Sequence, residues 1–128
     1  MVTDRYLHVH HQPDPAALAR FAGEGDLPVI GVDNVPGSVP VESYELPARC
    51  VLFFGSESDG LSPDALSVCD TTVSIAQYGS TRSLNVGAAA AIVMHTWIRQ
   101  HAPAPPRGPQ TSAPGAELGR SGFPTTEV

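Results

Sequence analysis

Short apolar runs alternate with segments of helical spacing along most of the chain. Two runs, 28–33 (PVIGVD) and 49–54 (RCVLFF), are apolar enough for strands buried on both faces, and the second predicts a central strand of the sheet. Shorter strands are predicted at 5–11 and 72–75, where β-branched and aromatic residues gather. This alternation of strands and helices predicts an α/β domain with a mainly parallel sheet.

Three helices are predicted, two of them from residues that favour a helix start. Asp14 and Ser62 each stand before a proline, as N-cap residues do, and predict helices at 16–22 and 61–69. The last helix, 83–101, is apolar nearly all round in its first three turns. Such a helix is buried either by its own domain or by a partner subunit.

The C-terminal segment has a composition that does not favour folding. Residues 103–128 contain six of the 13 prolines and four of the 12 glycines, with few large apolar side chains. A segment of this kind cannot bury enough surface to offset the entropy lost on ordering. We therefore expect one domain at 1–102 and a disordered Pro/Gly-rich tail at 103–128.

The charge balance is acidic, with a formal net charge of −6, and all seven basic residues are arginines. This balance disfavours non-specific binding to nucleic acid, although it leaves room for a local arginine patch. The chain has no secretory signal and no apolar run of about 18 residues. We expect a cytoplasmic protein without membrane contact, in which Cys50 and Cys69 are reduced and buried.

Two loops are candidates for chemistry. The first, GSESDG, follows the strand 49–54, and ligands in parallel α/β sheets bind at the carboxyl ends of strands. Gly55 and Gly60 allow backbone conformations that other residues resist, and Glu57 between them is poorly suited to a core. The alternative is an ordinary turn in which Glu57 is solvated.

The second loop, Ala76 to Ser83, leads into the last helix. Ser83 is the simplest N-cap of that helix, and Asn85 can make the same local bonds. Alternatively, the loop wraps a ligand with its backbone groups while Arg82 reaches an anion such as phosphate.

The three histidines near the N-terminus are a weaker candidate. In a strand, His8 and His10 would share a face and could form a metal-binding pair. No acidic or cysteine partner stands at a suitable spacing, so surface histidines and no metal are the default expectation.

Together the two loops resemble two motifs of the SpoU family in the SPOUT superfamily, the TrmH-like RNA ribose methyltransferases. LFFGSESDGLS at 52–62 resembles an apolar strand followed by G-x-E-x-x-G-L. IAQYGSTRSLNVGA at 75–88 resembles I-P-M-x-G-x-x-x-S-L-N-V followed by an alanine-rich helix. Ala76 and Gln77 replace the usual Pro and Met, and Ser58 replaces a common glycine.

The resemblance implies a deep trefoil knot (the alpha/beta knot of SPOUT proteins) at the C-terminal end of the sheet, with the last helix threaded through a loop. The family's first motif, an Asn-rich turn ending in an arginine, is not found in the sequence. We therefore expect the chain to correspond to the C-terminal portion of a catalytic domain whose first strands are missing.

The implied activity is transfer of a methyl group from S-adenosyl-L-methionine to a ribose 2′-hydroxyl of tRNA or rRNA, by a homodimer that pairs through its last helix. The alternative is a non-catalytic truncated remnant that binds cofactor or dimerises without methyl transfer. The resemblance implies catalytic roles for Glu57, Ser83 and Asn85, and cofactor contacts for Gly55, Gly60, Ile75, Gly79 and Leu84. From its charge and position, Arg82 is expected to contact RNA phosphate.

Overall fold

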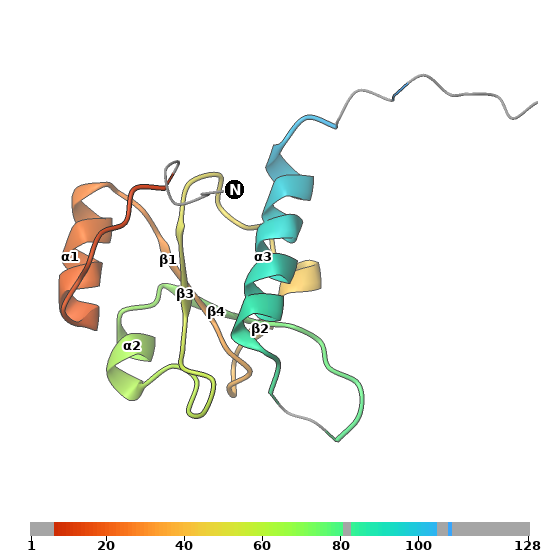
Figure 1. Cartoon of the computed structure of the whole chain (residues 1–128), viewed down its shortest axis with the longest axis horizontal. Helices are drawn as coiled ribbons and strands as arrows, with labels where there is room; N and C mark the ends of the chain where they lie inside the picture. The colour runs from red at the N-terminus through yellow and green to blue at the C-terminus, as the bar shows by residue number, and fades with distance from the viewer. Residues whose placement is uncertain (1–6, 81–82, 105–107, 109–128) are drawn as a thin grey trace, which may run out of the picture.

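The structure, a computed structural model, describes residues 7–80, 83–104 and 108. Its centre is a four-stranded sheet in the order β2-β4-β1-β3, in which every pair of neighbours is parallel (Figure 1). The predicted α/β class with a mainly parallel sheet is therefore confirmed. The strands are β1 (Val29–Val32), β2 (Val39–Pro40), β3 (Val51–Phe54) and β4 (Thr71–Ser74).

The register of the strands aligns three of their carboxyl ends. Val32 of β1 pairs with Phe54 of β3 on one side and with Val73 of β4 on the other. The residues that follow β1, β3 and β4 therefore leave the sheet at the same edge. In a parallel sheet this edge is where a ligand site is expected.

Helices cover the two faces of the sheet separately. Helices α1 and α2 contact each other, whereas α3 contacts the short 3₁₀ helix η2 (Figure 1). The two N-caps predicted before a proline are confirmed, because Asp14 accepts a hydrogen bond from the Ala17 N–H and Ser62 accepts one from the Ala65 N–H. The helices are α1 (Pro15–Glu24), η2 (Val41–Ser43), α2 (Pro63–Ser67) and α3 (Val86–His101).

The core follows from the alternation of side chains along β1, all four of whose residues are buried. Ile30 and Val32 belong to the cluster that lies between the sheet and α3, which also contains Val93. Gly31 faces the opposite side, where a Cβ atom would lie 2.8 Å from the Cys69 Sγ. Successive residues of a strand point to opposite faces, so β1 supplies both halves of the core.

The predicted strand at 5–11 is wrong over the residues that the structure describes. Residues 7–12 form neither helix nor strand, and Leu7 and Val9 are 67% and 84% exposed. Because the segment pairs with no strand, His8 and His10 do not share a strand face. Both are exposed, and residues 5 and 6 lie outside the described part of the chain.

The position of two strands also differs from expectation. β3 was predicted to be central, but it pairs only with β1 and lies at the edge of the sheet, where its four residues are half-buried. β2 was not predicted, because Pro36, Gly37 and Pro40 are typical of a loop. Pro40 is compatible with an edge strand, since an edge strand does not need every N–H group for pairing.

The C-terminal half of α3 is hydrogen-bonded to the connector 44–47, which precedes β3. The Gln100 side chain accepts a hydrogen bond from the Leu46 N–H (2.8 Å) and donates one to the Tyr44 carbonyl (2.9 Å). The Trp97 indole N–H donates to the Pro47 carbonyl at 3.0 Å. These bonds hold α3 in a fixed position across the sheet.

Only one side of α3 is buried by the described residues. Ala89 and Val93 are buried, whereas Ile92, Met94 and Ile98 are 40%, 49% and 50% exposed. An apolar surface therefore remains along the outer side of this helix. No described helix has the length and apolar character needed to cross a membrane.

Candidate functional site

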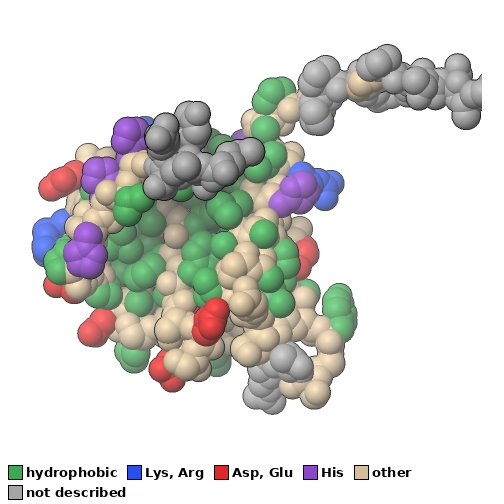
Figure 2. Space-filling view, in the orientation of Figure 1, with side chains coloured by type: hydrophobic (Ala, Val, Ile, Leu, Met, Phe, Trp, Pro, Cys, Tyr) green, Lys and Arg blue, Asp and Glu red, His purple; other side chains and the backbone are tan. Residues whose placement is uncertain are grey.

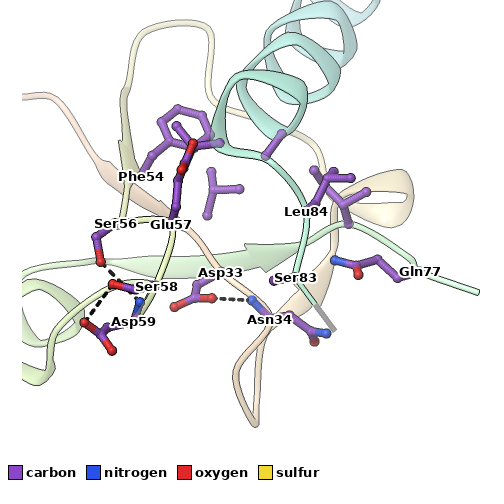
Figure 3. Close-up of a pocket in the computed structure, with 16 residues that line it drawn as sticks. Asp33, Asn34, Phe54, Ser56, Glu57, Ser58, Asp59, Gln77, Ser83 and Leu84 are labelled. Carbon is purple, nitrogen blue, oxygen red and sulfur yellow. Dashed lines mark hydrogen bonds between the residues drawn. The ribbon is translucent and has the colours of Figure 1, made fainter. Parts of the chain in front are cut away.

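A cavity of about 220 Å³ lies at the carboxyl edge of the sheet, where β1, β3 and β4 end near the start of α3 (Figure 3). Both candidate loops contribute to its wall, although they lie far apart in the sequence. The lining residues are 32–34, 54–60, 75, 77, 83, 84, 86 and 89.

The loop after β3 is a tight, closed turn. The backbone groups of Ser56 and Gly60 exchange two hydrogen bonds, of 3.1 and 3.0 Å. A Cβ atom on Gly55 would lie 2.0 Å from the Gly60 carbonyl carbon, and Gly60 itself has a φ of 67°. Glycine is therefore required at both positions, because no other side chain fits the first and few adopt the backbone of the second.

Asp33 connects this turn to the end of β1. One carboxylate oxygen of Asp33 accepts a hydrogen bond from the Leu61 N–H at 2.9 Å, and the other accepts one from the Asn34 N–H at 2.8 Å. The Asp33 N–H donates to the Val73 carbonyl of β4 at 3.0 Å. A single residue thus joins the ends of β1 and β4 to the turn that follows β3.

Asn85 connects the two candidate loops. Its side-chain oxygen accepts a hydrogen bond from the Ala88 N–H (3.1 Å), and its amide nitrogen donates to a carboxylate oxygen of Glu57 (3.4 Å). Asn85 is therefore the N-cap of α3, and the interpretation of Ser83 as the cap is wrong. The helix begins at Val86, and an N-cap directly precedes the first helical residue. Asn85 therefore stands three residues before the Ala88 N–H that it accepts, whereas Ser83 lies too far from the helix start.

Most of the site residues predicted from sequence meet at this cavity. Asn85 does not line the wall but contacts Glu57, which does. Gly79 is not among the lining residues, and nothing lies within 4 Å of the position of its Cβ. Arg82 lies outside the described residues. The predicted residues on the wall are Gly55, Glu57, Gly60, Ile75, Ser83 and Leu84.

Several lining residues were not predicted as site residues. Asp33 and Asn34 directly follow β1, and Ser56, Asp59 and Gln77 lie within the candidate loops (Figure 3). For Asp33 a signal was present, since a polar residue directly after a buried parallel strand lies where ligands bind. The other residues are ordinary loop residues by type, and only the fold places them at the wall.

The wall combines apolar and acidic side chains. Phe54, Ile75 and Leu84 provide apolar surface, and Asp33, Glu57 and Asp59 provide carboxylates. Among the described lining residues there is no Lys, Arg or His. Such a wall favours an organic ligand that carries a positive charge over a bare anion.

The cysteines and histidines do not form a second site in the described part of the chain. Cys50 and Cys69 are free thiols, and burial raises the pKa of both. Neither lines the cavity. Across residues 7–80, 83–104 and 108, no group of three or more His, Cys, Asp or Glu side chains could hold a metal ion.

Comparison with known proteins assigns this arrangement to a family. The family model described as "SpoU rRNA Methylase family" matches residues 1–95. A tRNA (guanosine(18)-2′-O)-methyltransferase of Borreliella burgdorferi is 34% identical over 82 residues, which cover 64% of this chain and 37% of that protein. A 23S rRNA (guanosine-2′-O-)-methyltransferase of Acinetobacter baylyi is 31% identical over 83 residues, covering 65% and 34%.

The fold is also similar to a solved structure with its cofactor. The SpoU methyltransferase AviRb of Streptomyces viridochromogenes, in complex with the cofactor AdoMet, matches with a TM-score of 0.63 and 29% identity. The match covers 70% of this chain and 36% of that chain. The chain thus spans little more than a third of the length of these relatives.

Proposed function

Because the chain belongs to the SpoU rRNA Methylase family, we propose that it takes part in transfer of a methyl group from S-adenosyl-L-methionine to a ribose 2′-hydroxyl of tRNA or rRNA. The observation that carries this proposal is the cavity at which the two motif loops meet. Residues 55–60 and residues 83–84 both line this cavity, and the Asn85 amide donates a hydrogen bond to Glu57 between the two loops.

The chemistry of the wall suits this cofactor. When bound, S-adenosyl-L-methionine supplies a methyl group on a positively charged sulfur, which a hydroxyl oxygen can attack. Backbone groups at Gly55, Gly60, Ile75 and Leu84 are close enough to the cavity to bind the adenosine portion. The Glu57 and Asp59 carboxylates on the wall attract this positive charge, and because both residues are exposed, water weakens the attraction.

The chain's own residues orient the reactants in this proposal. Glu57 and Asn85 fix the two loops relative to each other, and Ser83 on the wall contacts the substrate or the loop that holds it. Arg82, outside the described residues, contacts a phosphate of the RNA. Correct orientation supplies much of the acceleration of such a transfer, because it replaces a collision by a fixed approach.

Two measurements on the 128-residue chain test this function. Calorimetry should detect binding of S-adenosyl-L-methionine, and a labelled methyl group should appear on the 2′-oxygen of a tRNA or rRNA transcript. Binding without transfer would favour the alternative, a remnant that keeps the cofactor site only. Absence of binding would contradict the proposed function.

We also propose that the chain forms a homodimer through α3. The support is an apolar groove of about 550 Å³ between α3 and β3, whose lining includes Leu52, Met94 and Ile98. Hydrophobic side chains gather in the middle of this face (Figure 2). Monomeric proteins rarely expose large contiguous apolar patches, so a second copy is a reasonable occupant.

Three further expectations are part of the proposal. The deep trefoil knot, in which α3 would pass through a loop, rests on family membership alone, because no such threading is visible among the described residues. The disordered tail expected at 103–128, next to the methyltransferase domain 1–102, lies outside the described residues except for 103, 104 and 108. An RNA substrate of this kind implies a cytoplasmic protein.

A further inference from the structure

We propose that Asp33 is a positioning residue for the cofactor site, whose carboxylate holds the turn 55–61 in the conformation that receives S-adenosyl-L-methionine. This inference rests on the proposed function. Asp33 lies outside both motif loops, and it lines the same cavity as they do. Its role is indirect, since it acts through the backbone of the turn.

The geometry ties Asp33 to the last residues of the turn. An Asp33 oxygen accepts a hydrogen bond from the Leu61 N–H at 2.9 Å, across 28 positions of sequence. The same oxygen lies 2.5 Å from the point where a Cβ of Gly60 would stand. The carboxylate is therefore in close contact with the Gly60 backbone, and Leu61 is 5% exposed, which limits replacement of this bond by water.

The position of Asp33 does not itself depend on its side chain. The Asp33 N–H donates to the Val73 carbonyl at 3.0 Å, which extends the pairing of β1 with β4. Substitution of the side chain should therefore release the turn while the sheet stays intact. A role in positioning the site can thus be separated from a role in folding.

The carboxylate is better suited to this position than an amide. Both of its oxygens accept a backbone N–H group, one from Leu61 and the other from Asn34. In Asp33→Asn only one oxygen remains, so one N–H group faces an amide nitrogen that is itself a donor. The buried Leu61 N–H then loses its partner or the Asn34 bond is lost, and the turn becomes less constrained.

The chain provides a matched control at the other end of the same strand. An oxygen of Asp70 accepts a hydrogen bond from the Val29 N–H at 2.7 Å, a bond of the same type. Asp70 does not line the cavity. Asp70→Asn therefore measures the effect of the same carboxylate-to-amide change at a position away from the cavity.

The experiment compares the unchanged chain, Asp33→Asn and Asp70→Asn by calorimetry with S-adenosyl-L-methionine, and by amide hydrogen exchange at Leu61. We expect Asp33→Asn to raise Kd at least about tenfold and to speed exchange at Leu61, since a tenfold change matches loss of one such bond. Asp70→Asn should leave Kd within about twofold, as expected for a surface change away from the site.

Each outcome has a defined meaning. Equal affinity in Asp33→Asn and Asp70→Asn, together with faster exchange at Leu61 in Asp33→Asn, would overturn the inference and leave the proposed function intact. Absence of binding by the unchanged chain would instead overturn the proposed function, and this inference with it. If Asp33→Asn does not fold or keeps the Leu61 bond, Asp33→Ala decides the matter, because it removes both acceptors and leaves no donor facing the Leu61 N–H. Unchanged affinity in Asp33→Ala would then refute the inference.

Discussion

At the scale of single residues, Asn85 makes two hydrogen bonds of different purpose. Its oxygen caps α3 through the Ala88 N–H, and its amide nitrogen reaches Glu57 in the other loop. The first bond stabilises the helix, and the second connects the two walls of the cavity. Substitutions that keep one bond and remove the other can therefore separate stability from function.

Asn85→Ala should remove both bonds, lower stability by about 1 kcal/mol and abolish methyl transfer. Asn85→Asp should keep the cap, because an aspartate oxygen also accepts the Ala88 N–H and its charge is favourable at a helix start. It loses the donor to Glu57, however, and places two carboxylates together. Urea unfolding should thus distinguish the variants, while both fail in a methylation assay. Normal turnover by Asn85→Asp would contradict a role for the Glu57 contact.

The Cys69 thiol links stability to pH. Burial raises its pKa, the negative charge of Asp70 raises it further, and a backbone hydrogen bond with Gly31 lowers it. The folded chain therefore keeps a proton that the unfolded chain loses near the usual cysteine pKa of about 8.5. The resulting stability is fully present below that value and is lost as pH rises through the folded pKa.

We expect the free energy of unfolding to fall between about pH 7.5 and about pH 9.5, a window that lies below the usual tyrosine pKa. Urea unfolding at several pH values measures this slope. In Cys69→Ala the slope should be smaller, and it should decrease again when Cys50, whose pKa is also raised by burial, is replaced by Ala. An unchanged slope in the double variant would show that other groups cause it.

At the scale of elements, α3 depends on a few side-chain bonds near its C-terminal end. Gln100 acts as donor and acceptor at once toward the connector, through the Leu46 N–H and the Tyr44 carbonyl. Leu46 is fully buried, at 0% exposure, so its N–H group has little access to water. An unsatisfied buried group of this kind costs about 1–3 kcal/mol.

Gln100→Ala should therefore lower the free energy of unfolding by about 1–3 kcal/mol without change in the urea m-value. Arg99→Ala is the control, because Arg99 is an exposed neighbour and its loss should change stability by less than about 0.5 kcal/mol. Circular dichroism during urea unfolding provides the measurement. If the two variants were equally stable, the connector would not depend on this side chain.

The elements also show where reading the sequence succeeds. β1 and β3 were predictable because the runs VIGV and VLFF are apolar without interruption. Helices α1 and α2 were predictable because an N-cap residue and the N–H group that it accepts are only three residues apart, as in Asp14–Ala17 and Ser62–Ala65. β2 was not predictable from the sequence, since its two residues are a strand only because they pair with β4. The strand predicted at 5–11 is not formed over residues 7–11, because a local preference for strand does not supply a second strand to pair with.

The site shows the same contrast between residues that a local motif identifies and residues that only the folded sheet brings together. Residues within the two motifs, such as Gly55 and Glu57, were predictable because the motifs place them directly after a strand. Asp33 was not predicted, although its distance from Leu61 is set by the register of β1 with β3. Contacts between strands that are distant in sequence depend on the sheet order, and here that order differed from the expected central position of β3.

At the scale of the whole molecule, the hydrophobic character of β3 does not match its place at the edge of the sheet. Edge strands usually carry charges or other features that prevent further pairing. In the described part of the chain, β3 instead adjoins the groove formed with Met94 and Ile98 of α3. In the proposed homodimer, a second copy of the chain covers this groove.

We therefore expect light scattering after size-exclusion chromatography to give the mass of a dimer at micromolar concentrations. Ile98→Glu should shift the chain toward monomer, because it would bury a charge in an apolar interface. Phe21→Glu is the matched control, since Phe21 is 44% exposed on α1, does not line the groove, and receives the same charge. If both variants had the mass of the unchanged chain, α3 would not be the interface. Equal dissociation by both would place the interface elsewhere or reflect general repulsion between more acidic chains.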